Sequence, residues 1–415
     1  MAANPLPPPP QSADRGTRET YLRAHAAGIY DRLTNGRRIF LRADELCRRA
    51  AAEFPGLLPS DAELAAEAPR LQKDKQGAEI AQGLFLSAVL GDPVAGTHLC
   101  HASLLPLPVS QARLAEFQRA GALDLGGARI ERQGKAAVVT MQNPRFLNAE
   151  DESTLGPLET AIDIALLDTQ TDICVLRGGA VDHPRYAGRR LFGAGINLTH
   201  LYQGKIRYLW YLLRDLGLVN KIYRGVALPD VSPEVDCREK LWIGAIEGFA
   251  IGGHCQTVLT LDYVLATTDA YMTLPARKEG IIPGAANLRL ERYVGARLAR
   301  EAVLAELRLD CASAEGRLIC DELVPPPEMD AAIARTVEKL TGSGVVSAAG
   351  NRRAFRISEE PLDSFRRYMS VYAREQAQCH LSPALIANLE RNWNAATRSS
   401  RRPRWMPKST SSSRC

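Results

Sequence analysis

The stretch Ala245 to Gln256, AIEGFAIGGHCQ, decides what this chain folds into. An apolar strand leads to the pair Gly252 and Gly253, and the apolar segment at 257–261 continues as a helix. Glycines let a backbone turn tightly and lie close to a ligand because they carry no side chain. At a helix start they also leave free N–H groups, supported by the positive end of the helix dipole. Alone, the pattern fits an ordinary strand-to-helix turn at least as well.

A second glycine segment, RRLFGAGINL at 189–198, lies upstream of the first. In this order the two segments resemble the two oxyanion-hole segments of the crotonase (enoyl-CoA hydratase/isomerase) superfamily. The resemblance is collinear from about residue 125 to 325 and includes the strand with NPRFLNAE at 136–150 and the turn EGIIPG at 279–284. Neither a G-x-G-x-x-G nor a P-loop pattern is present, which argues against a dinucleotide or nucleoside triphosphate site.

The resemblance implies an α/β protein with a crotonase-like core, a spiral of β-β-α turns. Helical patterning precedes and follows that core. We expect a flexible leader at 1–16, an N-terminal helical domain at 17–122, the catalytic core at 123–328, a C-terminal helical region at 329–397 and a basic disordered tail at 398–415. The helical domain carries no chemistry-bearing motif, so we expect it to serve packing or oligomer contacts. By analogy with the superfamily we expect a homo-oligomer, a trimer or a hexamer.

Composition is that of an ordinary soluble globular protein. The 415 residues are 46% hydrophobic and 24% charged, and no apolar run is long enough to span a membrane. The net charge of +5 comes from the tail, because the chain without its six basic residues after Thr397 is near neutral. Binding of nucleic acid or anionic lipid by that tail is the less favoured alternative to a disordered end. The N-terminus lacks a signal-peptide profile, so we expect a cytoplasmic protein without nucleic-acid or membrane partners.

Cysteine and histidine spacing indicates a reduced protein without a metal site. The nine cysteines form no C-x-x-C pair, and the seven histidines are scattered. Neither pattern matches the spacing of metal ligands. We therefore expect no metal.

The resemblance assigns a chemical role to two backbone groups. Two N–H groups that converge on one carbonyl oxygen stabilise an enolate or a tetrahedral oxyanion. By alignment with the family motifs these donors are Ile196 and Gly253. The superfamily implies an acyl-coenzyme A thioester whose carbonyl lies in this hole. Arg189 and Arg190 stand where the family often has a basic residue near the coenzyme A phosphates; a solvated basic face is the alternative.

The acids of the superfamily's hydratases are missing. A hydratase activates water with two carboxylates. The first position is Gln256, whose amide cannot act as a base, and the second is Ala276. The sequence therefore argues against hydration.

An oxyanion hole without an acid pair, together with a long helical N-terminal extension, resembles one branch of the superfamily. Its members are dioxygenases that use neither a metal nor an organic cofactor. The resemblance implies conversion of 3,5-dihydroxyphenylacetyl-CoA and dioxygen to 3,5-dihydroxyphenylglyoxylate and free coenzyme A, through an α-carbanion stabilised in the hole. Two alternatives stay open: an isomerase or decarboxylase acting on another acyl-CoA, and a non-catalytic acyl-CoA-binding scaffold.

Polar side chains must hold the hydroxyls of such a substrate. Gln256 should point at the acyl group, with a satisfied core amide as the alternative. We expect a helix over 205–224; Arg214 borders its apolar stripe and faces either the acyl pocket or a surface salt bridge. Glu150 is a candidate for hydroxyl binding or proton abstraction, or a cap of the following helix. His254 is expected to pack beside the hole. The sequence does not identify the base or the walls of the dioxygen pocket.

Overall fold

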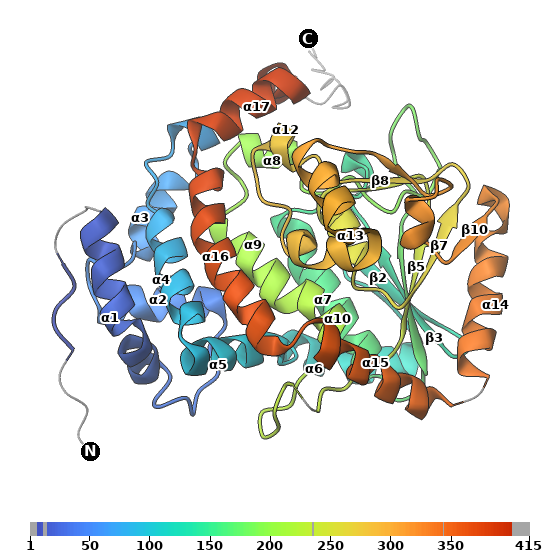
Figure 1. The fold of residues 1–415 in the computed structure, drawn as a ribbon, viewed down its shortest axis with the longest axis horizontal. Coiled ribbons are helices and arrows are strands. Elements are labelled where there is room, and N and C mark those ends of the chain that lie inside the picture. Colours follow the sequence, from blue (N-terminus) through green and yellow to red (C-terminus); the bar gives the residue numbers. More distant parts are fainter. Residues whose placement is uncertain (1–5, 11–14, 235, 343, 401–415) are drawn as a thin grey trace, which may run out of the picture.

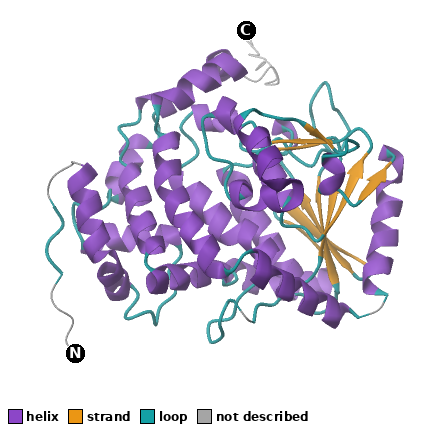
Figure 2. Cartoon of the chain, in the orientation of Figure 1, coloured by secondary structure: helices purple, strands orange, loops and turns teal. Residues whose placement is uncertain are grey.

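The structure is a computed structural model that describes residues 6–10, 15–234, 236–342 and 344–400. Helices occupy one side of the molecule and a twisted sheet the other (Figures 1 and 2). The helices before the sheet are α1 (Arg15–Leu33), α2 (Ala43–Glu53), α3 (Asp61–Glu67), η1 (Gln72–Asp74), α4 (Ile80–Gly91), α5 (Pro93–Leu104) and α6 (Pro108–Ala120).

The main sheet has seven strands in the order β1-β2-β3-β4-β5-β7-β10. The first three strands pair antiparallel, and β3 through β10 pair parallel. The strands are β1 (Ala122–Asp124), β2 (Ala128–Gln133), β3 (Ala136–Met141), β4 (Ile173–Gly178), β5 (Trp242–Ile246), β7 (Tyr263–Thr267) and β10 (Glu322–Val324). Because β3, β4 and β5 are buried almost throughout, they form the continuous apolar runs typical of parallel strands with both faces covered.

Helices cover both faces of this sheet. One face packs against α7 (Glu152–Leu167) and α13 (Ala286–Leu304), and the other against α14 (Met329–Thr341). A small second sheet pairs β6 (Phe249–Ile251), β8 (Tyr271–Thr273) and β9 (Leu309–Asp310). The remaining elements are η2 (Pro144–Phe146), α8 (Leu198–Tyr202), α11 (Gly253–Val258), α12 (Ala276–Glu279), η4 (Gly316–Leu318) and η5 (Pro326–Glu328).

The helices at the two ends of the chain share one hydrophobic core. After α15 (Val345–Glu359), helix α16 (Leu362–His380) packs along α4, so that segments far apart in sequence lie side by side (Figure 1). The helices α17 (Pro383–Trp393) and α18 (Ala395–Ser400) follow. The same core includes Ile196, Trp210 and Tyr211, residues from the middle of the chain. The terminal helices therefore form one layer against the central part of the chain.

The structure adds detail to the expectations about both ends of the chain and about one helix in its middle. Leu6, within the leader expected to be flexible, packs against this shared core, and α1 begins at Arg15. At the other end α18 continues to Ser400, into the expected tail, and 401–415 lie outside the described residues. The helix expected over 205–224 is α9 (Tyr208–Leu213), a π-helical segment η3 (Arg214–Val219) and α10 (Asn220–Arg224). The domain boundaries remain predictions.

A buried cluster of ion pairs between side chains binds the C-terminal helices to the core. Glu360, between α15 and α16, accepts hydrogen bonds from Arg224 of α10 and from Arg289 and Arg292 of α13 at 2.7–3.1 Å. Glu360 and Arg289 are fully buried. Burial opposes ionisation of Glu360, but Arg289 and Arg224 outweigh it and lower its pKa to about 2.

We expect Glu360→Gln to destabilise the protein by roughly 3 kcal/mol, because breaking a buried ion pair leaves charge uncompensated. Since the pKa of Glu360 is lowered, its stabilisation is present above the unfolded pKa of about 4.3 and is lost as the pH falls toward 2. Urea denaturation at pH 7 measures the change. Glu359→Gln is the matched control: Glu359 is half-exposed and should shift stability by less than about 0.5 kcal/mol. An equal effect of both variants would contradict the role given to the cluster.

Candidate active site

The glycine pair joins β6 to α11. Gly252 has φ +56°, a left-handed conformation that glycine adopts without strain, and its N–H donates to the Thr273 carbonyl at 2.8 Å. Gly253 then begins the helix. Within the described part of the chain the Gly253 N–H has no protein acceptor.

The second glycine segment is held against the first. Gly193 pairs with β6 through two backbone hydrogen bonds of 3.0 and 3.1 Å. Gly195 has φ +77°, and a Cβ on it would lie 2.8 Å from the Ile251 carbonyl and 3.4 Å from the Gly253 nitrogen. Hence only glycine permits this approach. Among the described contacts the Ile196 N–H is also without an acceptor, and both free N–H groups belong to residues lining one cavity.

The cavity has a volume of about 30 Å³ and combines apolar and charged walls. Its walls come from the core and from α16 of the C-terminal helices. The lining residues that carry polar side chains are Glu150, Trp210, Tyr211, Arg214, Asp215, Gln256, Glu279 and Tyr372. Two donors facing one buried cavity form the arrangement required of an oxyanion hole.

Arg214 is the centre of the polar network, and it is buried, not a surface residue. Its guanidinium donates to Glu150 Oε1 at 2.9 Å, to Asp215 Oδ1 at 3.0 Å and to Gln256 Oε1 at 2.5 Å. It also donates to the Gly253 carbonyl at 2.8 Å, which fixes the glycine turn. The alternative of a surface salt bridge is therefore wrong, while contact of Arg214 with a substrate remains a prediction.

Gln256 is buried and its amide is largely engaged. Its oxygen accepts from Arg214, and its Nε2 donates to Asp215 Oδ1 at 2.8 Å. A second Nε2 hydrogen remains, since an amide nitrogen carries two. The side chain lines the cavity, so its predicted contact with the substrate would use that remaining donor.

Glu150 does not cap the following helix, contrary to one of the alternatives. Asp151 is the N-cap of α7 and accepts from the Ser153 N–H at 2.9 Å. Glu150 instead points at the cavity, where its Oε2 has no hydrogen-bond partner. Burial opposes ionisation of Glu150, but Arg214 outweighs it and the pKa of the carboxyl is lowered. Glu150 is thus an ionised acceptor with one free oxygen.

His254 contacts the glycine segment at Gly193 and Gly195. Its Nδ1 accepts from the Gly195 N–H at 2.9 Å, and a Cβ on Gly193 would lie 2.3 Å from its Nε2. Burial lowers the pKa of His254 to about 4, so the ring is neutral near pH 7. Its contacts agree with the expected packing role, and they orient the peptide that precedes the Ile196 N–H.

Arg189 and Arg190 lie outside the cavity. Arg189 forms an exposed ion pair of 2.6 Å with Asp269. Arg190 is exposed and donates weakly to the Gly178 carbonyl at 3.5 Å. Both side chains are exposed at the surface, and their role toward coenzyme A remains a prediction.

Sequence reasoning missed Glu279, a buried residue of α12 one turn after Ala276. It lines the cavity, and burial raises its pKa to about 8. The only signal in the sequence was that Glu279 follows Ala276, the position that lacks the acid, by one helical turn. A helix as short as α12 could not be predicted with enough certainty to use that spacing. The Trp210 Nε1 and the Tyr211 hydroxyl, also in the lining, are further polar atoms without a partner.

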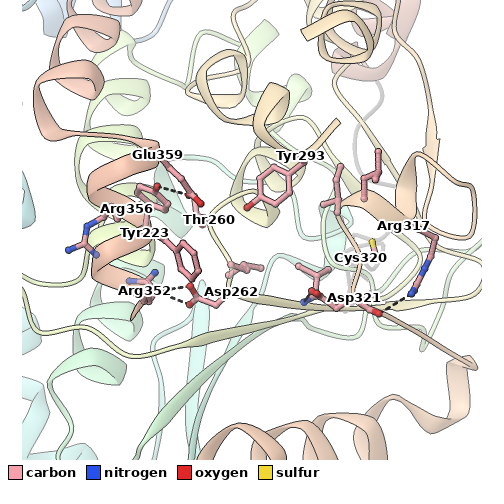
Figure 3. A pocket seen from close by; sticks show the side chains of 15 residues that line it. Tyr223, Thr260, Asp262, Tyr293, Arg317, Cys320, Asp321, Arg352, Arg356 and Glu359 are labelled. Atoms are coloured by element: carbon pink, nitrogen blue, oxygen red, sulfur yellow. Dashed lines mark hydrogen bonds and ion pairs between the residues drawn. The ribbon is translucent and has the colours of Figure 1, made fainter. Parts of the chain in front are cut away.

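A larger hollow of about 420 Å³ lies elsewhere, beside α13 and α15 (Figure 3). Its charged groups have partners: Arg352 pairs with Asp262 at 2.8 Å within the lining, while Arg356 pairs with Glu239 and Glu359 with Arg292 outside it. It includes neither of the free N–H donors described above. Paired charges at this place serve the fold, so the smaller cavity is the candidate active site.

The described ranges contain no group of three or more His, Cys, Asp or Glu side chains placed to hold a metal ion. Over the same residues, every helix is too short or too polar to cross a bilayer.

Comparison with known proteins agrees with this geometry. Residues 131–362 match the family model described as enoyl-CoA hydratase/isomerase. The chain belongs to this family. A curated protein of Amycolatopsis orientalis named (3,5-dihydroxyphenyl)acetyl-CoA 1,2-dioxygenase is 48% identical over 364 residues, 88% of this chain and 83% of that protein. The Short-chain-enoyl-CoA hydratase of Clostridium acetobutylicum is 26% identical over 56% of this chain and 82% of its own length.

Solved structures confirm the crotonase-like α/β fold of the family. An enoyl-CoA hydratase from Mycobacterium avium subsp. paratuberculosis K-10 has a TM-score of 0.53 and 20% identity, covering 68% of this chain and 100% of its own. An enoyl-CoA hydratase/isomerase from Xanthobacter autotrophicus Py2 gives 0.53 and 21%, over 66% and 97% of the two chains. At this identity the likeness concerns the fold alone.

We expect Gln256→Glu to lower stability by about 1–3 kcal/mol, because it replaces the donor to Asp215 by a second acid. Denaturant unfolding measures the loss, which should shrink at low pH where the acids are protonated. The double variant Gln256→Glu with Asp215→Asn reverses the hydrogen bond and should recover most of it. A stable single variant, or no recovery in the double variant, would show that this contact does not organise the network.

Proposed function

We propose that this protein is a dioxygenase that converts 3,5-dihydroxyphenylacetyl-CoA and dioxygen to 3,5-dihydroxyphenylglyoxylate and free coenzyme A. The observation that carries the proposal is the 48% identity, over 88% of the chain, to a protein named for that substrate and reaction class. The free N–H groups of Ile196 and Gly253 at one cavity supply the support that such chemistry needs.

The hole prepares the thioester for reaction with dioxygen. When the two N–H groups bind the thioester oxygen, negative charge on it is stabilised and the α C–H becomes more acidic. The aryl ring spreads the resulting carbanion, which passes one electron to dioxygen; recombination then gives a peroxide at the α-carbon. Attack of the peroxide on the thioester carbonyl breaks the C–S bond, expels coenzyme A and closes a cyclic peroxide. Loss of the remaining α-proton then breaks the O–O bond and leaves the α-keto acid. Of the two α-hydrogens, one ends on the thiol and one is released as a proton.

The polar end of the cavity recognises the two phenol hydroxyls. Glu150 Oε2 has a free acceptor, and Gln256 Nε2 has a spare hydrogen. Arg214 holds both of these side chains in place. We assign substrate binding to these three residues, and we assign the coenzyme A phosphates to Arg189 and Arg190 at the surface.

The remaining parts of the proposal concern cofactors and surroundings. We propose that the reaction needs no metal and no organic cofactor, with dioxygen as the cosubstrate. Every cysteine among the described residues is unpaired, which fits the reducing cytoplasm. A homo-oligomer, trimeric or hexameric, is proposed by analogy with the superfamily.

Anaerobic mixing with 3,5-dihydroxyphenylacetyl-CoA, followed by admission of dioxygen, tests the reaction. We expect one equivalent each of free thiol and keto acid per dioxygen consumed, because the equation balances in those amounts. An isomerase or decarboxylase would change the acyl-CoA without consuming dioxygen. A scaffold would bind the thioester and leave it intact.

Exhaustive treatment with a strong chelator should leave the rate of dioxygen consumption unchanged, because the proposed steps use only substrate carbon, dioxygen and backbone donors. Metal analysis of the treated sample provides the control. Activity that disappears on chelation and returns with one added metal would overturn this part of the proposal.

A further inference from the structure

Two carboxyl groups approach the glycine turn from different elements. A Cβ on Gly253 would lie 2.5 Å from Glu150 Oε2, and a Cβ on Gly252 would lie 3.8 Å from both oxygens of Glu279. Both acids are about 95% buried and line the cavity that the free N–H groups face. A thioester held by the Gly253 N–H would therefore lie within reach of both acids.

The partners of these two acids differ. Glu150 is bound by Arg214 at 2.9 Å and has His254 at 3.9 Å. Glu279 has no hydrogen bond from its side chain and no ion pair among the described residues. Consequently the pKa of Glu150 is lowered, whereas burial raises that of Glu279 to about 8. When their surroundings move the pKa values of two acids apart in this way, the difference indicates which acid exchanges a proton in the reaction.

The groups around Glu279 leave its charge uncompensated. On its own helix, Arg277 and Lys278 extend outward to Glu306 at 3.3 and 2.6 Å. Across the cavity Arg214 is already engaged by Glu150 and Asp215. Tyr211 of α9, Asp215 of η3 and Tyr372 of α16 line the same cavity. Gln376 of α16 accepts from the Ile282 N–H just after α12, and Asn388 and Asn392 of α17 donate to backbone carbonyls of α12.

We propose that Glu279 is the base that removes the α-proton of the bound thioester. The inference rests on the proposed function and identifies the residue that starts the reaction. Ala276, at the second acid position of the family's hydratases, occupies the same short helix one turn earlier. The chain thus presents a carboxyl to the cavity from one turn further along that helix.

The proton transfer balances without any other reactant. The α C–H bond breaks, its electron pair becomes the thioester enolate, and an O–H bond forms on Glu279. Negative charge moves from a carboxylate without a counter-ion to an oxygen that two N–H groups stabilise. The net charge of the buried cavity is unchanged. Glu150, whose charge Arg214 stabilises, is the weaker base and keeps its role as an acceptor for the substrate hydroxyl.

The pH dependence follows from the ionisation that a base needs. Glu279 must be a carboxylate to accept the proton, and its pKa of about 8 means that the ionised fraction grows as the pH rises toward 8. Since kcat/KM reports the free enzyme, it should rise with pH and level off above about 8. A residue donating a proton would give the opposite slope.

The test is hydrogen–deuterium exchange at the α-carbon of 3,5-dihydroxyphenylacetyl-CoA in D2O without dioxygen, followed by NMR. The wild-type protein should exchange the α-hydrogens, and Glu279→Gln should slow exchange and later dioxygen consumption at least about a hundredfold, the usual contribution of a general base. It should also lose the rise with pH. Glu279→Asp should keep part of the rate, because its carboxylate is retained.

Controls separate the base from structural effects. Glu306→Gln disturbs the outer contacts of α12, away from the cavity, and should leave the rate unchanged. Thermal unfolding and binding of the acyl-CoA confirm that Glu279→Gln is folded. Wild-type exchange matched by Glu279→Gln, or a pH rise that survives in this variant, would overturn the inference while the proposed function stands. A wild-type protein that neither exchanges nor consumes dioxygen would instead refute the proposed function, and the inference with it.

Discussion

The guanidinium of Arg214 is the group on which the rest of the site depends. It fixes Glu150, Asp215 and Gln256 in one buried network and also binds the carbonyl of Gly253. Through that last bond the polar network that lines the cavity is coupled to the glycine turn that carries the Gly253 N–H. A buried charge with this many partners cannot be removed without leaving several unsatisfied groups, so hole and polar wall form one structural unit.

The helices at the chain ends are part of this unit. Tyr372 of α16 lines the cavity, and the Gln376 side chain of the same helix accepts from the Ile282 N–H at 2.9 Å. Glu360 holds the start of that helix to the core through three arginines. Helix α16 therefore supplies part of the cavity wall and holds the loop after α12 in place.

Much of this could be predicted from sequence because the hole is built from backbone. Gly195 and Gly253 are required by close contacts and Gly252 by its positive φ. The glycine pattern therefore carries the geometry, and it indicated the fold family and the two N–H groups predicted as donors. Networks of side-chain contacts leave no comparable pattern in the sequence. The hydrogen-bond partners of Arg214 come from three segments: Glu150, the neighbouring Asp215 and helix α11. Arg214 itself begins a π-helical stretch that a helical periodicity does not distinguish. No sequence pattern could identify Glu279, because what distinguishes this carboxyl is that no cation among the described residues pairs with it.

The charges already present around Arg214 explain why position 256 carries an amide and not a carboxylate. Arg214 is bound by both Glu150 and Asp215, so a third carboxylate there would face Asp215 across the 2.8 Å now spanned by the amide hydrogen bond. Like charges about 4 Å apart repel by roughly 4 kcal/mol at an effective dielectric constant of 20. An amide of the same shape completes the network without that repulsion. A cavity arranged in this way can carry one additional negative charge, on Glu279 before proton transfer or on the thioester after it, and this favours carbanion chemistry over the two-carboxylate activation of water.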